Sequence, residues 1–330
     1  MRRLRWFIAV AAAFGALVLG GSVSLPYYAI GPGPARDVEP LIRIEGAPRF
    51  ASEGRFVLTS VTFSQLTGLG MLGAWLDPDR SVVERERVYP SGEPARVERR
   101  RAISEMDQSK LDAVAAVLRR LTDYPRAHGE GVLVESVVPG CAADGVLYPG
   151  DLILRIDGQE VDTVRRARRL IAAVPSGQRL RFEVTVDGEP QTLRLVREPC
   201  GGSEDPLVGV SLLNSFPIQV RISSGSIGGP SAGLMWALGL YDLLTPGDLT
   251  GGRTIAGTGA IGPDGAVYPV GGVAEKLHAA ARAGAQVFLL PRENLREAEA
   301  AGDRGMDLVP MDDLDDALAY LQGGKAPQGG

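Results

Sequence analysis

Residues 228–244, GGPSAGLMWALGLYDLL, constrain the fold of this chain more than any other stretch. From Ser231 onward the run has the composition of a helix that is apolar on every side. Such a helix has no face for water, so other elements must enclose it in the core of a domain. Its N-terminus is different, because free N–H groups and the positive end of the helix dipole suit that end to chemistry. We therefore expect a buried scaffold helix with one hydroxyl at its first turn.

The residues around this helix, 206–322, alternate between strand and helix patterns. Strands are predicted at residues 216–222, 254–260, 266–270 and 287–290, and helices at residues 231–244, 273–284 and 311–321. This order predicts an α/β (α+β) domain with one compact core. The glycine-rich residues 323–330 are expected to form a flexible tail.

The chain begins with Arg2, Arg3 and Arg5, followed by an uncharged stretch over residues 6–25. About 20 apolar residues span the hydrocarbon core of a bilayer, and basic residues stay on the cytoplasmic side. Residues 1–25 are therefore predicted to be a single-pass anchor in the cell membrane, with a cytoplasmic N-terminus and the bulk of the chain extracytoplasmic. A cleaved signal peptide is the alternative, although the cleavage-site pattern at residues 20–24 is weak.

Residues 26–125 are expected to form a membrane-proximal stalk and an α/β segment. Proline and glycine are frequent in residues 26–40, which predicts the stalk. Residues 41–101 resemble short strands, and residues 102–121 have helical spacing. A G-x-G-x-x-G sequence at residues 68–73 is discounted as a nucleotide-binding motif, because no long helix is expected before Pro78. The net charge of −5 gives no reason to expect a nucleic-acid partner.

Residues 126–199 combine short strands, Asp-Gly turns and an amphipathic helix at residues 165–174. The stretch GVLVESVVPGCAADGVLYPGDLILRIDG resembles a bacterial PDZ domain. The resemblance implies that a peptide C-terminus binds as an added strand beside the helix, with its carboxylate in the loop from His128 to Gly131. A packing module with an empty groove is the alternative. Outside the cytoplasm Cys141 and Cys200 could pair, and two free thiols remain equally open.

Lysine is rare in this chain, since only Lys110, Lys276 and Lys325 occur among its 35 basic residues. Arginine keeps its proton in proteins, whereas a desolvated lysine can lose it. At about 100° per residue, Lys276 lies at the edge of the apolar face of helix 273–284 and is expected to turn inward. A neutral amine near pH 7 is a competent base for a serine hydroxyl, which alone is a weak nucleophile.

The opposite side of the same helix carries Glu275, His278 and Arg282, which are expected to face solvent. His278 then points roughly 160° away from Lys276. This placement argues against an α/β-hydrolase esterase, which the G-x-S-x-G pattern around Ser231 otherwise indicates, because that class needs a histidine beside its nucleophile. Another alternative is that Ser231 is only a helix N-cap.

The predicted catalytic residues are therefore Ser231 and Lys276, and the N–H groups from Gly229 to Ala232 are expected to bind the oxyanion. No metal is expected, because a structural zinc site takes four ligands and the chain has only two histidines and two cysteines. The sequence indicates no cofactor.

The motif GGPSAG, the stretch TGAIGPDGAVYPVGG and Lys276 in PVGGVAEKLHAA make residues 206–322 closely similar to the Ser-Lys proteolytic domain of Lon proteases. The resemblance implies a ribosomal protein S5 domain 2-like fold, with Ser231 as nucleophile, Lys276 as base and Thr258 as the threonine that supports the lysine. Two positions depart from it: Gly228 replaces an acidic residue of many relatives, and Ala260 replaces a glutamate.

With its anchor and PDZ-like module, the whole chain resembles membrane-anchored PDZ-Lon proteins of the YlbL type, and the family implies hexameric rings. No G-x-x-x-x-G-K-[ST] motif occurs, so no ATP-driven motor is expected. These features predict an ATP-independent serine endopeptidase that cleaves unfolded or tail-exposed proteins and recruits peptide C-termini through its PDZ-like domain. A catalytically silent adaptor that captures tails is the alternative.

Overall fold

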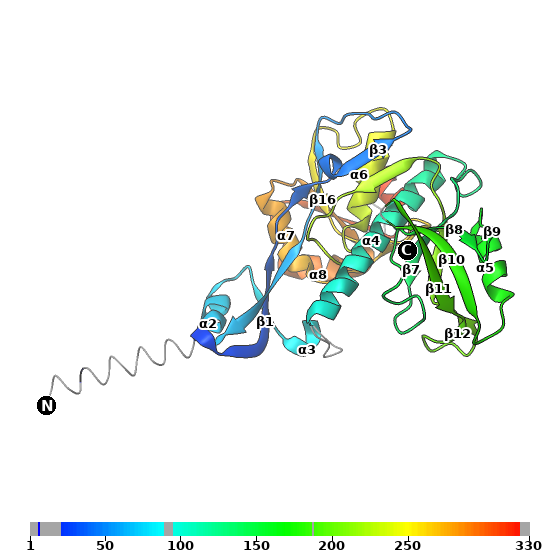
Figure 1. Ribbon diagram of the computed structural model, residues 1–330. Helices are drawn as coiled ribbons and strands as arrows, with labels where there is room; N and C mark the ends of the chain where they lie inside the picture. Colours follow the sequence, from blue (N-terminus) through cyan, green and yellow to red (C-terminus); the bar gives the residue numbers. More distant parts are fainter. Residues whose placement is uncertain (1–5, 7–20, 89–94, 187, 324–330) are drawn as a thin grey trace.

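The computed structural model describes residue 6 and residues 21–88, 95–186 and 188–323 (Figure 1). The strands are β1 (Ser24–Pro32), β2 (Arg36–Asp37), β3 (Ile42–Glu45), β4 (Arg55–Leu58), β5 (Val61–Thr67), β6 (Ser81–Glu84), β7 (Val132–Val137), β8 (Leu152–Ile156), β9 (Gln159–Glu160), β10 (Arg179–Val186), β11 (Glu189–Val196), β12 (Glu198–Pro199), β13 (Pro206–Leu207), β14 (Val210–Asn214), β15 (Gln219–Ile222), β16 (Thr254–Gly257), β17 (Ala260–Ile261), β18 (Val267–Tyr268), β19 (Val287–Pro291) and β20 (Asp307–Met311). The helices are η1 (Glu39–Leu41), α2 (Gly68–Leu76), α3 (Arg85–Val88), α4 (Ala95–Leu121), α5 (Val164–Ala172), α6 (Gly233–Leu244), α7 (Val273–Arg282), η2 (Arg292–Asn294), α8 (Leu295–Ala301) and α9 (Leu314–Leu321).

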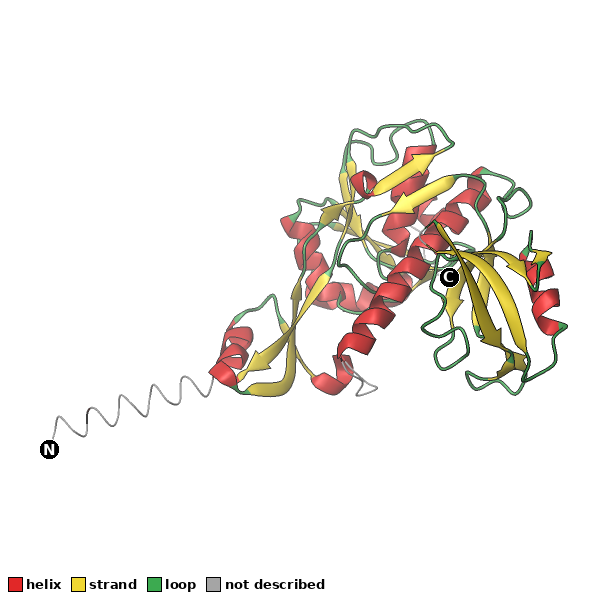
Figure 2. Ribbon diagram, in the orientation of Figure 1, coloured by secondary structure: helices red, strands yellow, loops and turns green. Residues whose placement is uncertain are grey.

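A five-stranded sheet in the order β2-β4-β16-β19-β20 forms the centre of the larger domain. Strands β4, β16, β19 and β20 run parallel, and β2 is antiparallel to β4. Because side chains alternate across a strand, Ile255 and Leu289 face one core with α4, α6 and α9, whereas Ala256 and Phe288 face a second core with α7 and α8. Helices thus cover both faces of the sheet (Figure 2), which is the α/β arrangement that the sequence predicts.

The enclosed helix predicted from residues 231–244 is α6. It begins at Gly233, because Ser231 and Ala232 form the turn before it. Trp236 at its centre is 0% exposed, so the predicted burial is confirmed. Close neighbours require glycine on this helix: a Cβ at Gly239 would lie 2.5 Å from Cγ1 of Val38.

The prediction of a stalk at residues 26–40 is wrong, because these residues belong to the fold. Strand β1 pairs with β5 and β6, β2 pairs with β4, and Val38 is buried in the main core. The glycine content has a packing reason instead. The Gly33 N–H donates to the carbonyl of Ser60 at 2.8 Å, and a Cβ at Gly33 would come within 2.5 Å of the Ser60 hydroxyl. Close approach between strands, rather than a flexible linker, explains the composition.

The segment 26–125 is not separate from the domain predicted at residues 206–322. Strand β4 pairs with β16 over four residues, from Arg55 opposite Thr254 to Leu58 opposite Gly257. Strand β3 also pairs with a distant strand, β15, in antiparallel orientation. Helix α4 shares the main core with α6, which places its long apolar face against the enclosed helix. The larger domain is therefore built from two stretches of chain that flank the PDZ-like module.

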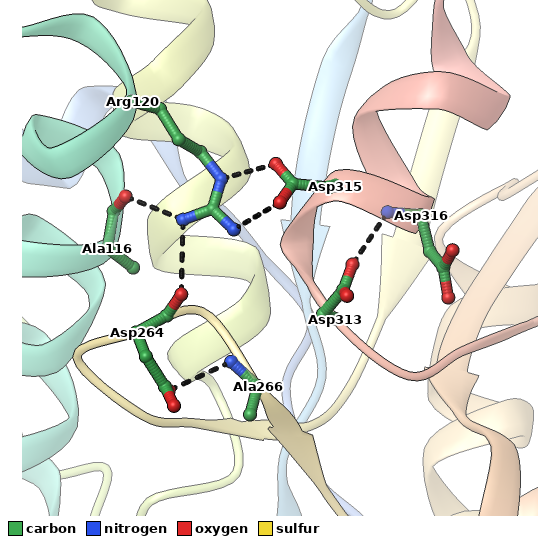
Figure 3. A network of polar contacts seen from close by, with 7 residues as sticks. All are labelled: Ala116, Arg120, Asp264, Ala266, Asp313, Asp315 and Asp316. Atoms are coloured by element: carbon green, nitrogen blue, oxygen red, sulfur yellow. Dashed lines mark hydrogen bonds and ion pairs between the residues drawn. The ribbon is translucent and has the colours of Figure 1, made fainter.

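A polar network joins these two stretches at the C-terminal end of α4 (Figure 3). The Arg120 guanidinium donates through Nη2 to Oδ2 of Asp315 at 2.8 Å, in the first turn of α9. Its Nη1 donates to the carbonyl of Ala116 at 2.9 Å and to the carbonyl of Asp264 at 3.4 Å, in the β17–β18 turn. One arginine thus ties α4 to a turn and a helix that lie more than 140 residues later.

The smaller domain lies between α4 and β15 and contains the predicted PDZ-like module. Its sheet has the order β11-β10-β8-β7-β14, with β9 paired to β8, and packs around its own core with α5. The predicted end at residue 199 is too early, because β14 completes this sheet beside β7. A disulfide joins Cys141 and Cys200, which decides the alternative that the sequence leaves open.

A three-stranded sheet, β5-β1-β6, carries α2 at the end of the molecule farthest from the PDZ-like domain (Figure 1). No long helix is expected before Pro78, and the G-x-G-x-x-G residues 68–73 lie inside the nine-residue helix α2. Thr67 caps this helix by accepting the Gly70 N–H. Among the described residues no helix is long and apolar enough to cross a membrane. Residues 1–5 and 7–20 of the predicted anchor lie outside that part of the chain.

Two carboxyl groups meet where α4 contacts the PDZ-like domain. Asp112 on α4 is buried and lies beside Glu135 on β7. Burial, and then repulsion by Glu135, raises the pKa of Asp112 to about 8. A folded-state pKa above the unfolded value of about 3.9 means that the native protein binds the extra proton between those two values. The stability contributed by this group is therefore complete below pH 4 and is lost as the pH rises toward 8.

Replacing Asp112 with asparagine is expected to remove the loss of stability that wild type shows as the pH rises from 4 toward 8. At pH 9 the variant Asp112→Asn should be more stable than wild type by on the order of a few kcal/mol, since the asparagine stays neutral. Urea unfolding at pH 5, 7 and 9 measures the difference. The control is Asp123→Asn, whose side chain is exposed just after α4 and should change little. A variant that is destabilised equally at every pH would contradict the assignment.

Candidate active site

The loop from β15 to α6 presents Ser231 at the buried end of the α6 scaffold. Its backbone is fastened to the end of β16, because the Ser231 carbonyl accepts the Gly259 N–H at 2.8 Å and the Thr258 hydroxyl at 3.0 Å. The Leu234 N–H in turn donates to the Gly259 carbonyl at 3.0 Å. Ser231 itself is half-buried and provides no side-chain cap to α6, so the N-cap alternative is not what the structure shows.

Lys276 lies on α7 and turns inward, as the helix periodicity predicts. Its side chain is 2% exposed, and Nζ donates to the Thr258 hydroxyl at 3.0 Å. Burial lowers the pKa of Lys276 to about 8, although Glu297 and Glu275 act in the opposite direction. Removing an ammonium from water disfavours its charged form, which explains the direction of the shift.

The Thr258 hydroxyl joins the two predicted catalytic residues. It accepts from Lys276 Nζ and donates to the Ser231 carbonyl, so its proton is committed to Ser231 and its lone pair to the lysine. An amine that donates to threonine keeps its own lone pair free when it is neutral. Within the described residues no hydrogen bond links Ser231 Oγ directly to Lys276 Nζ. The Thr258 hydroxyl connects the lysine amine to the backbone carbonyl of Ser231 instead.

The predicted oxyanion site is corrected at Gly229. The Gly229 N–H donates to the carbonyl of Ala102 on α4 at 2.7 Å, so this group is already satisfied. The N–H groups of Gly233 and Leu234 are also used. Across the described part of the chain, no hydrogen bond uses the N–H of Ser231 or Ala232. These two donors, at the positive end of α6, are the ones that remain for an oxyanion.

Helix α4 is a part of this site that the sequence analysis did not assign. The buried Ser109 donates to the Pro230 carbonyl at 2.8 Å and so fastens the turn to α4. Contact with α4 also explains why residue 228 is glycine and not the acidic residue of many Lon relatives. A Cβ at Gly228 would lie 3.0 Å from the Cβ of Ala102 on α4. An acidic side chain at this position would need α4 to shift. The signal in the sequence was a polar residue, Ser109, on the apolar face between Met106 and Ala113.

The far side of α7 differs from the prediction. His278 is only 14% exposed, with Nδ1 2.8 Å from Asp79 Oδ1 and Nε2 3.0 Å from Arg304 Nη2. Glu275, expected to face solvent, is buried and bonded to the Ser81 hydroxyl. The β5-β1-β6 sheet, which local periodicity could not place, covers this face. His278 is thus held away from Ser231, which removes the histidine that an α/β-hydrolase would need.

Strand β7, which follows the loop expected to hold a carboxylate, is paired on both edges with other strands of the chain. Strand β14 pairs antiparallel with β7, from Val210 opposite Val137 to Asn214 opposite Val132. The loop expected to hold a carboxylate instead bonds the chain, since the Gly129 N–H donates to the Ser215 carbonyl at 3.2 Å. Strand β14 is therefore the edge strand beside α5, and Asn214 Oδ1 accepts the Val164 N–H at 2.9 Å. No cluster of three metal-binding side chains occurs in the described residues.

Comparisons with known proteins find two families in this chain. Residues 205–322 match the Lon protease (S16) C-terminal proteolytic domain, and residues 113–186 match the PDZ domain. The chain is 25% identical over 242 residues to the Lon protease of Rhizobium meliloti, covering 67% of this chain and 27% of that protein. It is 38% identical over 106 residues to the Lon protease of Roseiflexus castenholzii, covering 31% of this chain and 13% of that protein.

The chain thus spans about a quarter, or less, of the length of these curated relatives. Among solved structures, the PDZ domain of an SdrC-like protein from Listeria monocytogenes is 24% identical, covers 26% of this chain and 88% of that chain, and has a TM-score of 0.24. By its sequence matches, the chain contains a PDZ domain and, at residues 205–322, the C-terminal proteolytic domain of Lon proteases, a domain of serine-type peptidases.

Proposed function

We propose that the chain is an ATP-independent serine endopeptidase with a Ser231–Lys276 dyad, which cleaves unfolded or tail-exposed proteins outside the cytoplasmic membrane. The observation that carries this proposal is the buried lysine amine that shares the Thr258 hydroxyl with the Ser231 backbone. A surface lysine would stay protonated near neutral pH and could not act as a base.

In this mechanism the neutral Lys276 amine takes the proton of Ser231 Oγ, and that oxygen attacks the scissile carbonyl carbon. The N–H groups of Ser231 and Ala232 donate to the developing oxyanion. Lys276 then gives the proton to the departing amine, which leaves an acyl-enzyme. A water molecule, deprotonated by the same lysine, attacks the ester, and the lysine returns that proton to Ser231 Oγ as the acyl C–O bond breaks and the carboxylic acid product leaves. Thr258 holds the amine in place throughout.

The substrate range follows from what the chain encodes. Its sequence contains no Walker A motif, so substrates must reach Ser231 already unfolded. We place peptide recruitment at the outer edge of β14, the last strand of the PDZ sheet beside α5. This strand continues through residues 215–218 into β15 and then to the turn with Ser231. Membrane attachment through residues 1–25, and self-assembly as the Lon resemblance implies, belong to the same proposal.

The direct test is cleavage of a chemically unfolded protein by the full-length chain in the absence of nucleotide. We expect new peptide termini to appear at the same rate with and without ATP. A chain that binds peptides with free C-termini but releases no fragments would support the adaptor alternative. A rate that depends on ATP would contradict the proposal in its present form.

The pH dependence of cleavage gives a separate prediction. The amine must be neutral to act, and the pKa of Lys276 is lowered from its ordinary value to about 8. Below pH 8 the neutral fraction falls tenfold per pH unit, so kcat/KM at pH 6 should be about 100-fold below its plateau. Initial rates between pH 6 and 10 measure this profile, and Lys110→Met should leave it unchanged. A rate that is flat over this range would rule out a titrating amine.

A further inference from the structure

An apolar surface is exposed at the end of the molecule that carries α2. This nine-residue helix reads GLGMLGAWL and contains no charged side chain. Its Trp75 is 81% exposed. We define the apolar tip as the exposed apolar residues on the side of the sheet that α2 covers: Leu69, Leu72, Trp75 and Leu76 of α2 and Val82 of β6.

The fold itself uses only one narrow side of α2. Ala74 is the fully buried residue of this helix, and it packs with Ala29 and Leu66 in a small core of its own. Tyr27 and Met71 lie partly buried against that core. The remaining apolar side chains point away from the protein, so no packing requirement within the described residues explains them. Such a surface on a soluble protein usually contacts a partner or a membrane.

The position of the tip in the chain identifies the partner. The uncharged run of residues 6–25 ends here, because Ser24 of β1 pairs with Thr67, the residue that caps α2. Gly21, near the end of that run, lies against the helix, since a Cβ there would be 3.6 Å from Cδ1 of Leu69. The start of β1 and α2 lie side by side at the same end of the molecule (Figure 1).

We propose that α2 lies in the interfacial layer of the bilayer that the uncharged run enters, with the apolar tip inserted among the lipid chains. Binding to this layer grows with the apolar area that is buried in it, and tryptophan favours the boundary between head groups and acyl chains. The inference rests on the membrane attachment in the proposed function and adds a second contact. One span leaves a domain free to rotate, whereas a span and an adjacent inserted helix fix its orientation.

The tip is connected to the helix that carries Lys276. The loop and strand that follow α2 contact α7 through Asp79, which bonds His278, and through Ser81, which bonds Glu275. Strand β1 also contacts α7. Val61 of β5, the strand paired with β1, packs beside Gly272 at the start of α7. Insertion of the tip therefore sets the height and orientation of α7, and with it the active site, above the membrane.

Tryptophan fluorescence of the full-length chain in vesicles of brominated phosphatidylcholine tests the proposal. The variant Trp6→Phe leaves Trp75 and Trp236, and Trp236 is fully buried in the main core. We expect brominated lipid to quench part of the emission and aqueous iodide to have little effect on that part. The matched control, Trp6→Phe with Trp75→Phe, should show no quenching by the lipid.

Each other outcome overturns the inference. Emission from Trp75 that iodide quenches and brominated lipid does not would place the tip in water. Emission that neither agent quenches would place it under protein, such as a second copy of the chain. Flotation of the same samples separates the two proposals: a chain that fails to float with the vesicles overturns membrane attachment as well, whereas a floating chain with unquenched Trp75 overturns the tip alone.

Discussion

Replacing Ser231 with alanine is expected to lower kcat/KM for cleavage of an unfolded protein by at least ~10³-fold, because the nucleophile is lost while binding and the oxyanion donors remain. The fold should be unchanged. Within the part of the chain that the structure describes, the hydrogen bonds that anchor this residue use its backbone carbonyl, which accepts from Thr258 and Gly259, and alanine keeps that carbonyl.

Fragment release measures the rate of the Ser231→Ala variant, and thermal unfolding measures its stability. The control is Ser226→Ala, which removes an exposed hydroxyl from the same loop and should keep full activity. Cleavage by Ser231→Ala within tenfold of wild type would show that another group is the nucleophile. A large fall in melting temperature would show that the serine is structural.

Replacing Lys276 with methionine is expected to abolish cleavage to a similar extent and to stabilise the protein. A folded-state pKa depressed from 10.5 to about 8 means that the unfolded chain binds more protons between those values. Stability therefore rises with pH over this range, and at pH 7 the wild type bears the full cost of its buried amine. Methionine has no charge to desolvate, so the gain at pH 7 should be roughly 3 kcal/mol.

The variant Lys276→Arg tests whether cleavage requires proton transfer at this position or only a positive charge. Arginine fills the site with a charge but keeps its proton, so it should be inactive like methionine and less stable than wild type. Cleavage rates and urea unfolding of both variants provide the test. An active arginine variant would exclude proton transfer by this side chain, and an unstable methionine variant would show that the amine contributes to folding. Lys110→Met controls for loss of a lysine elsewhere.

Several features of the site could be predicted from local sequence. The apolar character of α6 on every side required its burial, and the structure confirms this at Trp236. The periodicity of α7 turned Lys276 inward, which is also confirmed. Both inferences depend only on which residues share a helix face, and 3.6-residue periodicity carries that information. The hydrogen bond from Lys276 to Thr258 agrees with the contact that the Lon resemblance implies.

Other features depended on contacts between distant parts of the chain. Glu275 and His278 lie on the polar side of α7, yet the β5-β1-β6 sheet covers them, and periodicity does not say which element packs on a face. The sequence predicted the Gly229 N–H as an oxyanion donor, but in the structure this group donates to the carbonyl of Ala102 on α4. Charged or polar side chains become buried where a partner satisfies them, and that partner can lie anywhere in the sequence.

By itself, the sequence determined the enclosed helix and the inward lysine, because these follow from the local order of polar and apolar residues. Only the tertiary structure decided that β4 pairs with β16, that the PDZ domain interrupts the larger domain, and that β14 closes the edge of β7. A strand presents the same alternation of side chains whichever strand it joins. Its partner is chosen by packing of the whole core, across nearly 200 residues in the case of Arg55 and Thr254.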